Sequence, residues 1–239
     1  MLAAVDGFAR FAEAAAPVHT EDVERVCTLN EPNMIAALLP LLTQTHRRAV
    51  EVVKSRAPHV RTGWSVAVQA IEARPGGERV AEEYGRSRQD VFLHAAQGDD
   101  WLGIQTCTRV LVGLDGALPV PDGAERTLTG REFHPGALGA TLRRAAALAP
   151  GRPPVVTENG IATDDDTRRV ADTAEALTGL VGAMADGVDV RGYFHWSALD
   201  TYEWGSYRPT FGLVAVDRTT FVRTTFVRTT KPSAARPTA

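Results

Sequence analysis

Residues 25–33, RVCTLNEPN, decide the fold, because a short β-branched run ends in a carboxylate and then gives way to a helical pattern. Residues 154–160, PVVTENG, repeat this arrangement: a β-branched run ends in the carboxylate of Glu158. Pro32 suits the first turn of a helix, so Glu31 is expected at the carboxyl end of the first strand. Two glutamates are therefore predicted at equivalent positions on different strands.

The rest of the chain alternates in the same way. Strands are predicted at 25–29, 60–68, 100–107, 154–157 and 190–194. Helices are predicted over 34–56, with a break or kink at Pro40, and over 78–97, 135–148 and 166–186. The alternation predicts an α/β fold with a parallel sheet and helices packed outside it.

The first seventeen residues predict an amphipathic helix. Its apolar residues recur at helical spacing and are Leu2, Val5, Phe8, Phe11 and Ala15. No cationic segment precedes them, and no apolar run in the chain reaches the roughly 18 residues of a membrane span. A signal peptide and a membrane location are therefore not expected.

The amino-acid composition excludes few classes of function. The 239 residues are 44% hydrophobic with a formal charge of −3, as in a soluble globular protein with a sizeable core. The sequence has no basic stripe with interleaved aromatics, so nucleic acid is not expected as a partner. Cys27 and Cys107 form no CxxC pair, so a reducing cytoplasm is the expected compartment.

Glu31 and Glu158 are the residues that can carry chemistry. A single glutamate at a strand end is more often a capping or solvated carboxylate than a catalytic one. A pair suits glycoside hydrolysis, in which one carboxylic acid protonates the departing oxygen and a second carboxylate attacks the anomeric carbon. The acid needs a raised pKa, and the nucleophile is expected to stay ionised through hydrogen bonds.

Residues 192–204, GYFHWSALDTYEW, interleave aromatic side chains with carboxylates after the last predicted strand. An indole face stacks on the apolar face of a pyranose, and a carboxylate accepts hydrogen bonds from sugar hydroxyls. The alternative is a buried aromatic cluster, which suits Tyr193 and Phe194 better than Trp196, Glu203 and Trp204.

TLNEPN, VTENG and GYFHWSALDTYEW, in this order, resemble the three signatures of glycoside hydrolase family 1, the β-glucosidase family. FGLVAVDR at 211–218 resembles the C-terminal region of that family. The resemblance implies a (β/α)8 TIM barrel and a retaining β-glycosidase that hydrolyses β-linked glycosides by double displacement. It implies no cofactor and no metal.

The same resemblance implies a role for each site residue. Glu31 is the acid/base, and Glu158 is the nucleophile that forms the glycosyl-enzyme intermediate. Asn30 holds the sugar 2-hydroxyl, Trp196 is the stacking platform, and Glu203 and Trp204 bind the far hydroxyls of the sugar. Which sugar and which aglycone fit is left open.

The chain also departs from the family. The family places its TLNEP glutamate at the end of the fourth of eight strands, whereas Glu31 lies close to the first residue. The expected fold is thus one incomplete barrel domain over 1–239 with about five C-terminal βα units, whose open sheet a homo-oligomer could cover. Cys107 stands where the family has a tyrosine that donates to the nucleophile, so Glu158 is expected to lack that donor.

Two smaller features complete the sequence. TTFVR occurs at 219–223 and again at 224–228, so 219–239 is expected to be a duplicated segment and a frayed tail. Three adjacent aspartates at 164–166 are expected to cap a helix rather than bind a metal.

Two functions remain, a β-glycosidase and a non-catalytic barrel fragment with weak or no sugar binding.

Overall fold

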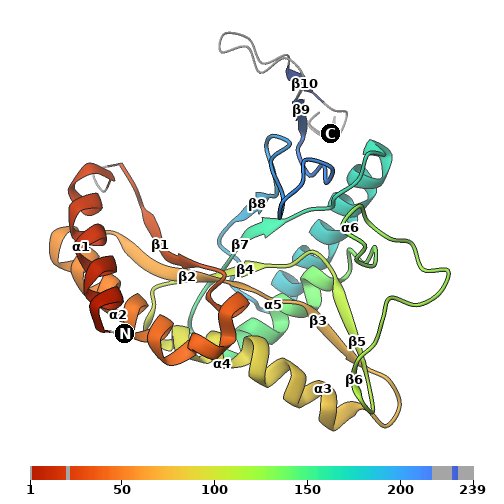
Figure 1. The fold of residues 1–239 in the computed structure, drawn as a ribbon, viewed down its shortest axis with the longest axis horizontal. Helices are drawn as coiled ribbons and strands as arrows, with labels where there is room; N and C mark the ends of the chain where they lie inside the picture. Colours follow the sequence, from red (N-terminus) through yellow and green to blue (C-terminus); the bar gives the residue numbers. More distant parts are fainter. Residues whose placement is uncertain (1, 20–21, 217–227, 231–239) are drawn as a thin grey trace.

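The computed structural model of the chain describes residues 2–19, 22–216 and 228–230. A parallel five-stranded sheet crosses the molecule, and the order of its strands in space is their order in the chain (Figure 1). The strands are β1 (Arg25–Asn30), β2 (Arg61–Ala67), β4 (Leu102–Gln105), β7 (Pro154–Asn159) and β8 (Tyr193–His195). All five predicted strands are confirmed, with ends that shift by a few residues.

The helices lie outside this sheet. They are α1 (Leu2–His19), η1 (Pro32–Leu38), α2 (Leu39–Arg56), α3 (Glu78–Gly85), η2 (Arg86–Asp90), α4 (Val91–Ala95), η3 (Ala96–Gly98), α5 (Ala137–Leu148) and α6 (Asp166–Ala185). The break predicted at Pro40 falls between η1 and α2, where Pro40 occupies the first turn of α2. None of the helices that the structure describes is long and apolar enough to cross a membrane.

The core lies between the sheet and helices α4, α5 and α6. Its fully buried members include Trp64, Val66, Phe92, Leu102, Ile104, Leu138, Leu142 and Val156. Helices α5 and α6 approach closely, because a Cβ on Gly139 would lie only 2.7 Å from the carbonyl oxygen of Gly179. At the start of α6, Asp165 Oδ1 accepts a hydrogen bond from Thr167 N at 2.9 Å, which confirms the predicted cap.

A second sheet was not predicted. It contains β3 (Ala70–Ala73), β5 (Arg109–Gly113) and β6 (Gly116–Ala117), with β5 in the middle. Strands β9 (Val214–Val216) and β10 (Arg228–Thr230) form a separate antiparallel pair. Most of the duplicated TTFVR segment and of the expected frayed tail lies outside the described residues.

Helix α1 packs against α2 as an amphipathic helix, but its predicted apolar face is wrong in part. The buried side chains are Val5, Ala9, Ala12 and Ala16, while Phe11 is 65% exposed. Small side chains let two helices approach closely, and a phenylalanine at their interface would hold them apart. The prediction favoured the largest apolar side chains of α1, whereas its contact face is made mainly of alanines.

Candidate active site

Glu31 and Glu158 both lie at the carboxyl end of the parallel sheet. Glu31 follows β1 directly in a left-handed conformation, φ 47° and ψ 49°, and its backbone N–H donates to Ser65 O of β2 at 2.8 Å. Glu158 lies in β7 and pairs in register with Gln105 of β4. The backbone hydrogen bond to β2 fixes where Glu31 leaves its strand, and both carboxylates are only partly buried.

Burial, together with neighbouring charges, raises the pKa values of both carboxylates. Burial, followed by the negative charges of Glu31 and Glu203, raises the pKa of Glu158 to about 7, and the Asn30 amide opposes that rise. Burial also raises the pKa of Glu31, while Arg131 lowers it and Glu203 raises it further. Burial and two neighbouring carboxylates thus work against the ionised form of Glu158, which hydrogen bonds were expected to maintain.

Gln105 is a site residue that the sequence argument missed. Its Nε2 donates to Glu158 Oε1 at 2.5 Å and to Asn30 Oδ1 at 2.7 Å, and its side chain is buried. Glu158 was expected to lack the tyrosine donor at position 107, and the Gln105 amide is a donor that was not predicted. The register of β4 beside β7 creates it, and only the position of Gln105 at the end of a predicted strand could have suggested it.

The aromatic segment reaches the site through Trp196. Its backbone N–H donates to Asn159 O at 2.9 Å, and its indole Nε1 donates to Glu203 Oε1 at 3.2 Å. Gly160 allows this approach, because a Cβ there would lie 2.1 Å from the Trp196 carbonyl oxygen. Trp196 and Glu203 are thus held as a pair beside the strand that carries Glu158.

Trp204 is placed differently from the other predicted residues. It has a positive φ of 48° in a tight turn, closed by backbone hydrogen bonds of 2.8 and 3.0 Å between Glu203 and Ser206. Its side chain is 85% exposed. The structure therefore gathers Asn30, Glu31, Glu158, Trp196 and Glu203, and leaves the Trp204 ring in solvent.

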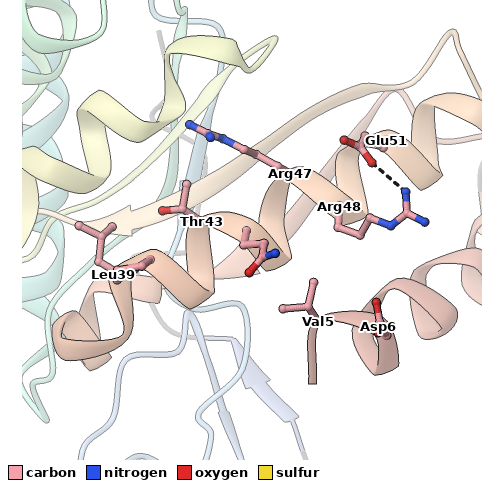
Figure 2. A pocket seen from close by; sticks show the side chains of 9 residues that line it. Val5, Asp6, Leu39, Thr43, Arg47, Arg48 and Glu51 are labelled. Carbon is pink, nitrogen blue, oxygen red and sulfur yellow. Dashed lines mark hydrogen bonds and ion pairs between the residues drawn. The ribbon is translucent and has the colours of Figure 1, made fainter. Parts of the chain in front are cut away.

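A cavity elsewhere in the molecule is the alternative candidate site. About 670 Å³ of space lies between α1 and α2, and none of the predicted site residues lines it (Figure 2). Arg48 and Glu51 pair across one turn of its wall at 2.8 Å, while Asp6 and Arg47 add further charges. Among the residues described, no group of three or more His, Cys, Asp or Glu could hold a metal ion. The paired carboxylates remain the candidate site.

Several known proteins resemble this chain in sequence. The sequence profile of Glycosyl hydrolase family 1 matches residues 121–236, a segment that holds Glu158, Trp196, Glu203 and Trp204. Thermostable beta-glucosidase B of Thermobispora bispora is 31% identical over an alignment that covers 92% of this chain and 61% of that protein. A beta-galactosidase of Sulfolobus acidocaldarius is 37% identical over 51% of this chain and 28% of that protein.

A solved structure extends the comparison to the fold. The crystal structure of beta-glycosidase BGL167 matches with a TM-score of 0.88 and 36% identity, over 96% of this chain and 64% of that one. The chain thus spans between about a quarter and two thirds of the length of these relatives. Its sheet and outer helices are part of a TIM barrel. In sequence and in fold, the chain resembles glycoside hydrolase family 1 over part of the length of these relatives.

Proposed function

We propose that the chain is a retaining β-glycosidase that hydrolyses β-linked glycosides by double displacement. The observation that carries the proposal is that Glu31 and Glu158 both lie at the carboxyl end of a single parallel sheet, where the charge of Glu31 contributes to raising the pKa of Glu158. Two carboxylates in this relation suit an acid and a nucleophile on either side of a glycosidic bond. The names of the relatives, beta-glucosidase and beta-galactosidase, support the same substrate class.

Each carboxylate has one task in the first step. Glu31, whose raised pKa favours the protonated form, gives its proton to the glycosidic oxygen as the bond to the leaving group breaks. Glu158 attacks the anomeric carbon and forms the glycosyl-enzyme. Water then attacks that carbon as Glu31 takes a proton from it, which releases the sugar and restores both groups.

The neighbouring residues hold the sugar. Trp196 offers an indole face, and Glu203, already hydrogen-bonded to that indole, accepts hydrogen bonds from sugar hydroxyls. Asn30, fixed by Gln105, contacts the 2-hydroxyl next to the attacked carbon. Trp204 joins the sugar site only if the turn that contains it closes over the bound sugar.

A second candidate function is a fragment that binds sugar weakly or not at all. Strands β1 and β8 lie at the two edges of the sheet, and neither pairs with a further strand among the described residues. A barrel that stays open exposes the site to water, which weakens every charge interaction in it. In the active alternative, a second copy of the chain covers the open side.

Hydrolysis of a panel of aryl β-glycosides tests the two functions. We expect Glu158→Gln and Glu31→Gln each to lower kcat by roughly a hundredfold to ten-thousandfold. The control Glu51→Gln, an exposed glutamate on α2, should match the wild type. A 2-deoxy-2-fluoro aryl glycoside should add one sugar mass to Glu158, as seen by peptide mass spectrometry. A folded wild type that turns over none of the panel would rule out the enzyme and favour the fragment.

A further inference from the structure

Strand β7 contains one residue more than the two strands between which it lies (Figure 1). Val156 of β7 lies opposite Ile104 of β4. The next residue of β4, Gln105, lies opposite Glu158, so β7 advances two residues while β4 advances one. The pairing of β7 with β8 also skips one residue of β7 in this stretch. An extra residue of this kind is a β-bulge, and it lies directly beside the proposed nucleophile.

The bulge decides which face of the sheet carries Glu158. Side chains of a regular strand alternate between the two faces, so Glu158 would share a face with Val156. Val156 belongs to the core that packs against the helices. With the extra residue, Glu158 lies on the opposite face, where its carboxylate accepts a hydrogen bond from Gln105 Nε2 at 2.5 Å. A strand without the bulge would direct this carboxylate into the core.

The side chain of Asn159, the residue after Glu158, joins β7 to both neighbouring strands. It is 3% exposed, its Nδ2 donates to Thr106 O at 2.6 Å, and its Oδ1 accepts from the Tyr193 hydroxyl at 3.0 Å. Thr106 directly follows β4, and its backbone N–H donates to Glu158 O at 3.1 Å. Because a carbonyl oxygen only accepts, the Asn159 amide makes both contacts in a single orientation. Its two hydrogen bonds therefore hold β7 from both sides where the bulge ends.

We propose that Asn159 is a positioning residue for the nucleophile: its amide holds the bulge of β7 and thereby keeps the Glu158 carboxylate on the face of the sheet that carries Gln105. The inference rests on the proposed glycosidase function. A nucleophile has to approach the anomeric carbon from a fixed direction, and a misplacement of about 1 Å costs on the order of a hundredfold in rate. At this position aspartate would lack the donor, and leucine would lack both hydrogen-bonding groups.

Asn159→Ala removes both hydrogen bonds and tests the proposal on an aryl β-glycoside. We expect kcat to fall about a hundredfold while KM changes little, because the residues proposed to hold the sugar remain. Thr141→Val is the matched control. It removes another buried hydrogen bond of Thr106, the 2.9 Å contact between the two threonine hydroxyls, and leaves the Asn159 amide in place. Its kcat should stay close to that of the wild type.

A second background separates positioning from general damage to the site. In Glu158→Ala, azide can enter the space of the missing carboxylate and attack the anomeric carbon of a dinitrophenyl glycoside. A glycosyl azide forms, and dinitrophenolate leaves with the bonding electrons and needs no proton. The position of residue 158 then no longer matters, so adding Asn159→Ala should leave the azide-dependent rate unchanged. An azide-dependent rate that falls about a hundredfold would overturn the proposal, as would an unchanged kcat when Glu158 is present.

Tyr193→Phe keeps the proposal testable if Asn159→Ala does not fold, because it removes only the hydroxyl that donates to Asn159 Oδ1. We expect a smaller loss of kcat than in Asn159→Ala, with KM again little changed. Since both variants act through one contact, the double variant should lose no more than Asn159→Ala alone. An unchanged kcat in Tyr193→Phe, or losses that add in full, contradicts the proposal.

Hydrogen exchange tests the hold on β7 without any substrate. The Thr106 amide hydrogen, which is bonded to Glu158 O, should exchange about tenfold faster in Asn159→Ala and Tyr193→Phe than in the wild type. Equal exchange in all three proteins would contradict the role of Asn159. A chain that hydrolyses no glycoside, yet shows the faster exchange, would refute the proposed function and leave Asn159 as the residue that holds the bulge.

Discussion

At the scale of single residues, the pKa of Glu158 determines the acid side of the pH profile. Glu158 has to be ionised when it attacks, yet its surroundings raise its pKa to about 7. We therefore expect kcat/KM for a neutral aryl glycoside to fall as the pH drops below about 7. A profile measured between pH 4 and 9 tests this, and a limb near 4.5, the ordinary value for a glutamate, contradicts it.

The same carboxylate affects stability. A carboxyl group whose pKa is raised by folding stabilises the protein fully below its unfolded value of 4.5, and this stabilisation is lost as the pH rises through about 7. A glutamine cannot ionise, so Glu158→Gln does not lose this stabilisation as the pH rises. We expect the variant to gain about 1 to 2 kcal/mol in free energy of unfolding at pH 8, after discounting for solvent screening, and clearly less at pH 5. Urea titrations at both pH values measure the difference, which should vanish if the carboxylate is well solvated.

Gln105 has a separate effect on Glu158. Because its Nε2 donates to the Glu158 carboxylate at 2.5 Å, Gln105→Leu removes a donor that favours the charged form. The acid limb of the pH profile should then move up by about one unit. Gln44→Leu, an exposed site on α2, is the control and should leave the limb in place. An unmoved limb in Gln105→Leu would show that Asn30 alone stabilises the charged form of Glu158.

At the scale of elements, α5 and α6 meet through Gly139 and Gly179. A Cβ on Gly139 would lie 2.7 Å from a backbone oxygen of α6, whereas a Cβ on Gly182 would meet only the flexible end of Arg143 at 3.3 Å. Gly139→Ala should therefore lower the free energy of unfolding by about 1 to 3 kcal/mol. Gly182→Ala should leave it unchanged or raise it by up to about 1 kcal/mol, because alanine favours a helix. Equal effects in urea unfolding would contradict the close approach.

The elements differ in how well the sequence predicts them. The five strands of the main sheet were predictable because each is a run of mostly apolar or β-branched residues followed by a turn or a helix. Strand β3, residues 70–73, is too short to show a period, and its pairing with β5 is accompanied by an ion pair between Arg109 and Glu72 at 2.8 Å. Contacts between segments far apart in the chain determine such elements, and local patterns do not contain them.

At the scale of the whole molecule, the sequence likewise predicts some residues of the candidate site and misses others. The motif residues Glu31 and Glu158 were predictable, because each follows from a strand that ends in a carboxylate. Gln105 was not, since its relation to Glu158 depends on the register of β4 beside β7. Resemblance to a family predicts the groups that the motifs contain. Only the folded chain shows which neighbouring side chains shift the pKa values of those groups.

The open sheet leads to the last prediction, which concerns assembly. Edge strands present unpaired backbone groups, and β8 adds Phe194, which is 61% exposed. We expect the chain to self-associate, so that light scattering after size exclusion gives a mass above 25.7 kDa that rises with concentration. Phe194→Lys should shift the protein toward the monomer, because a charge on an edge strand opposes strand pairing. Val181→Lys on α6, where Val181 is 62% exposed, should leave the mass unchanged. A wild type that stays at 25.7 kDa at every concentration would mean that the edges remain uncovered, and catalysis would then have to occur in an open half-barrel.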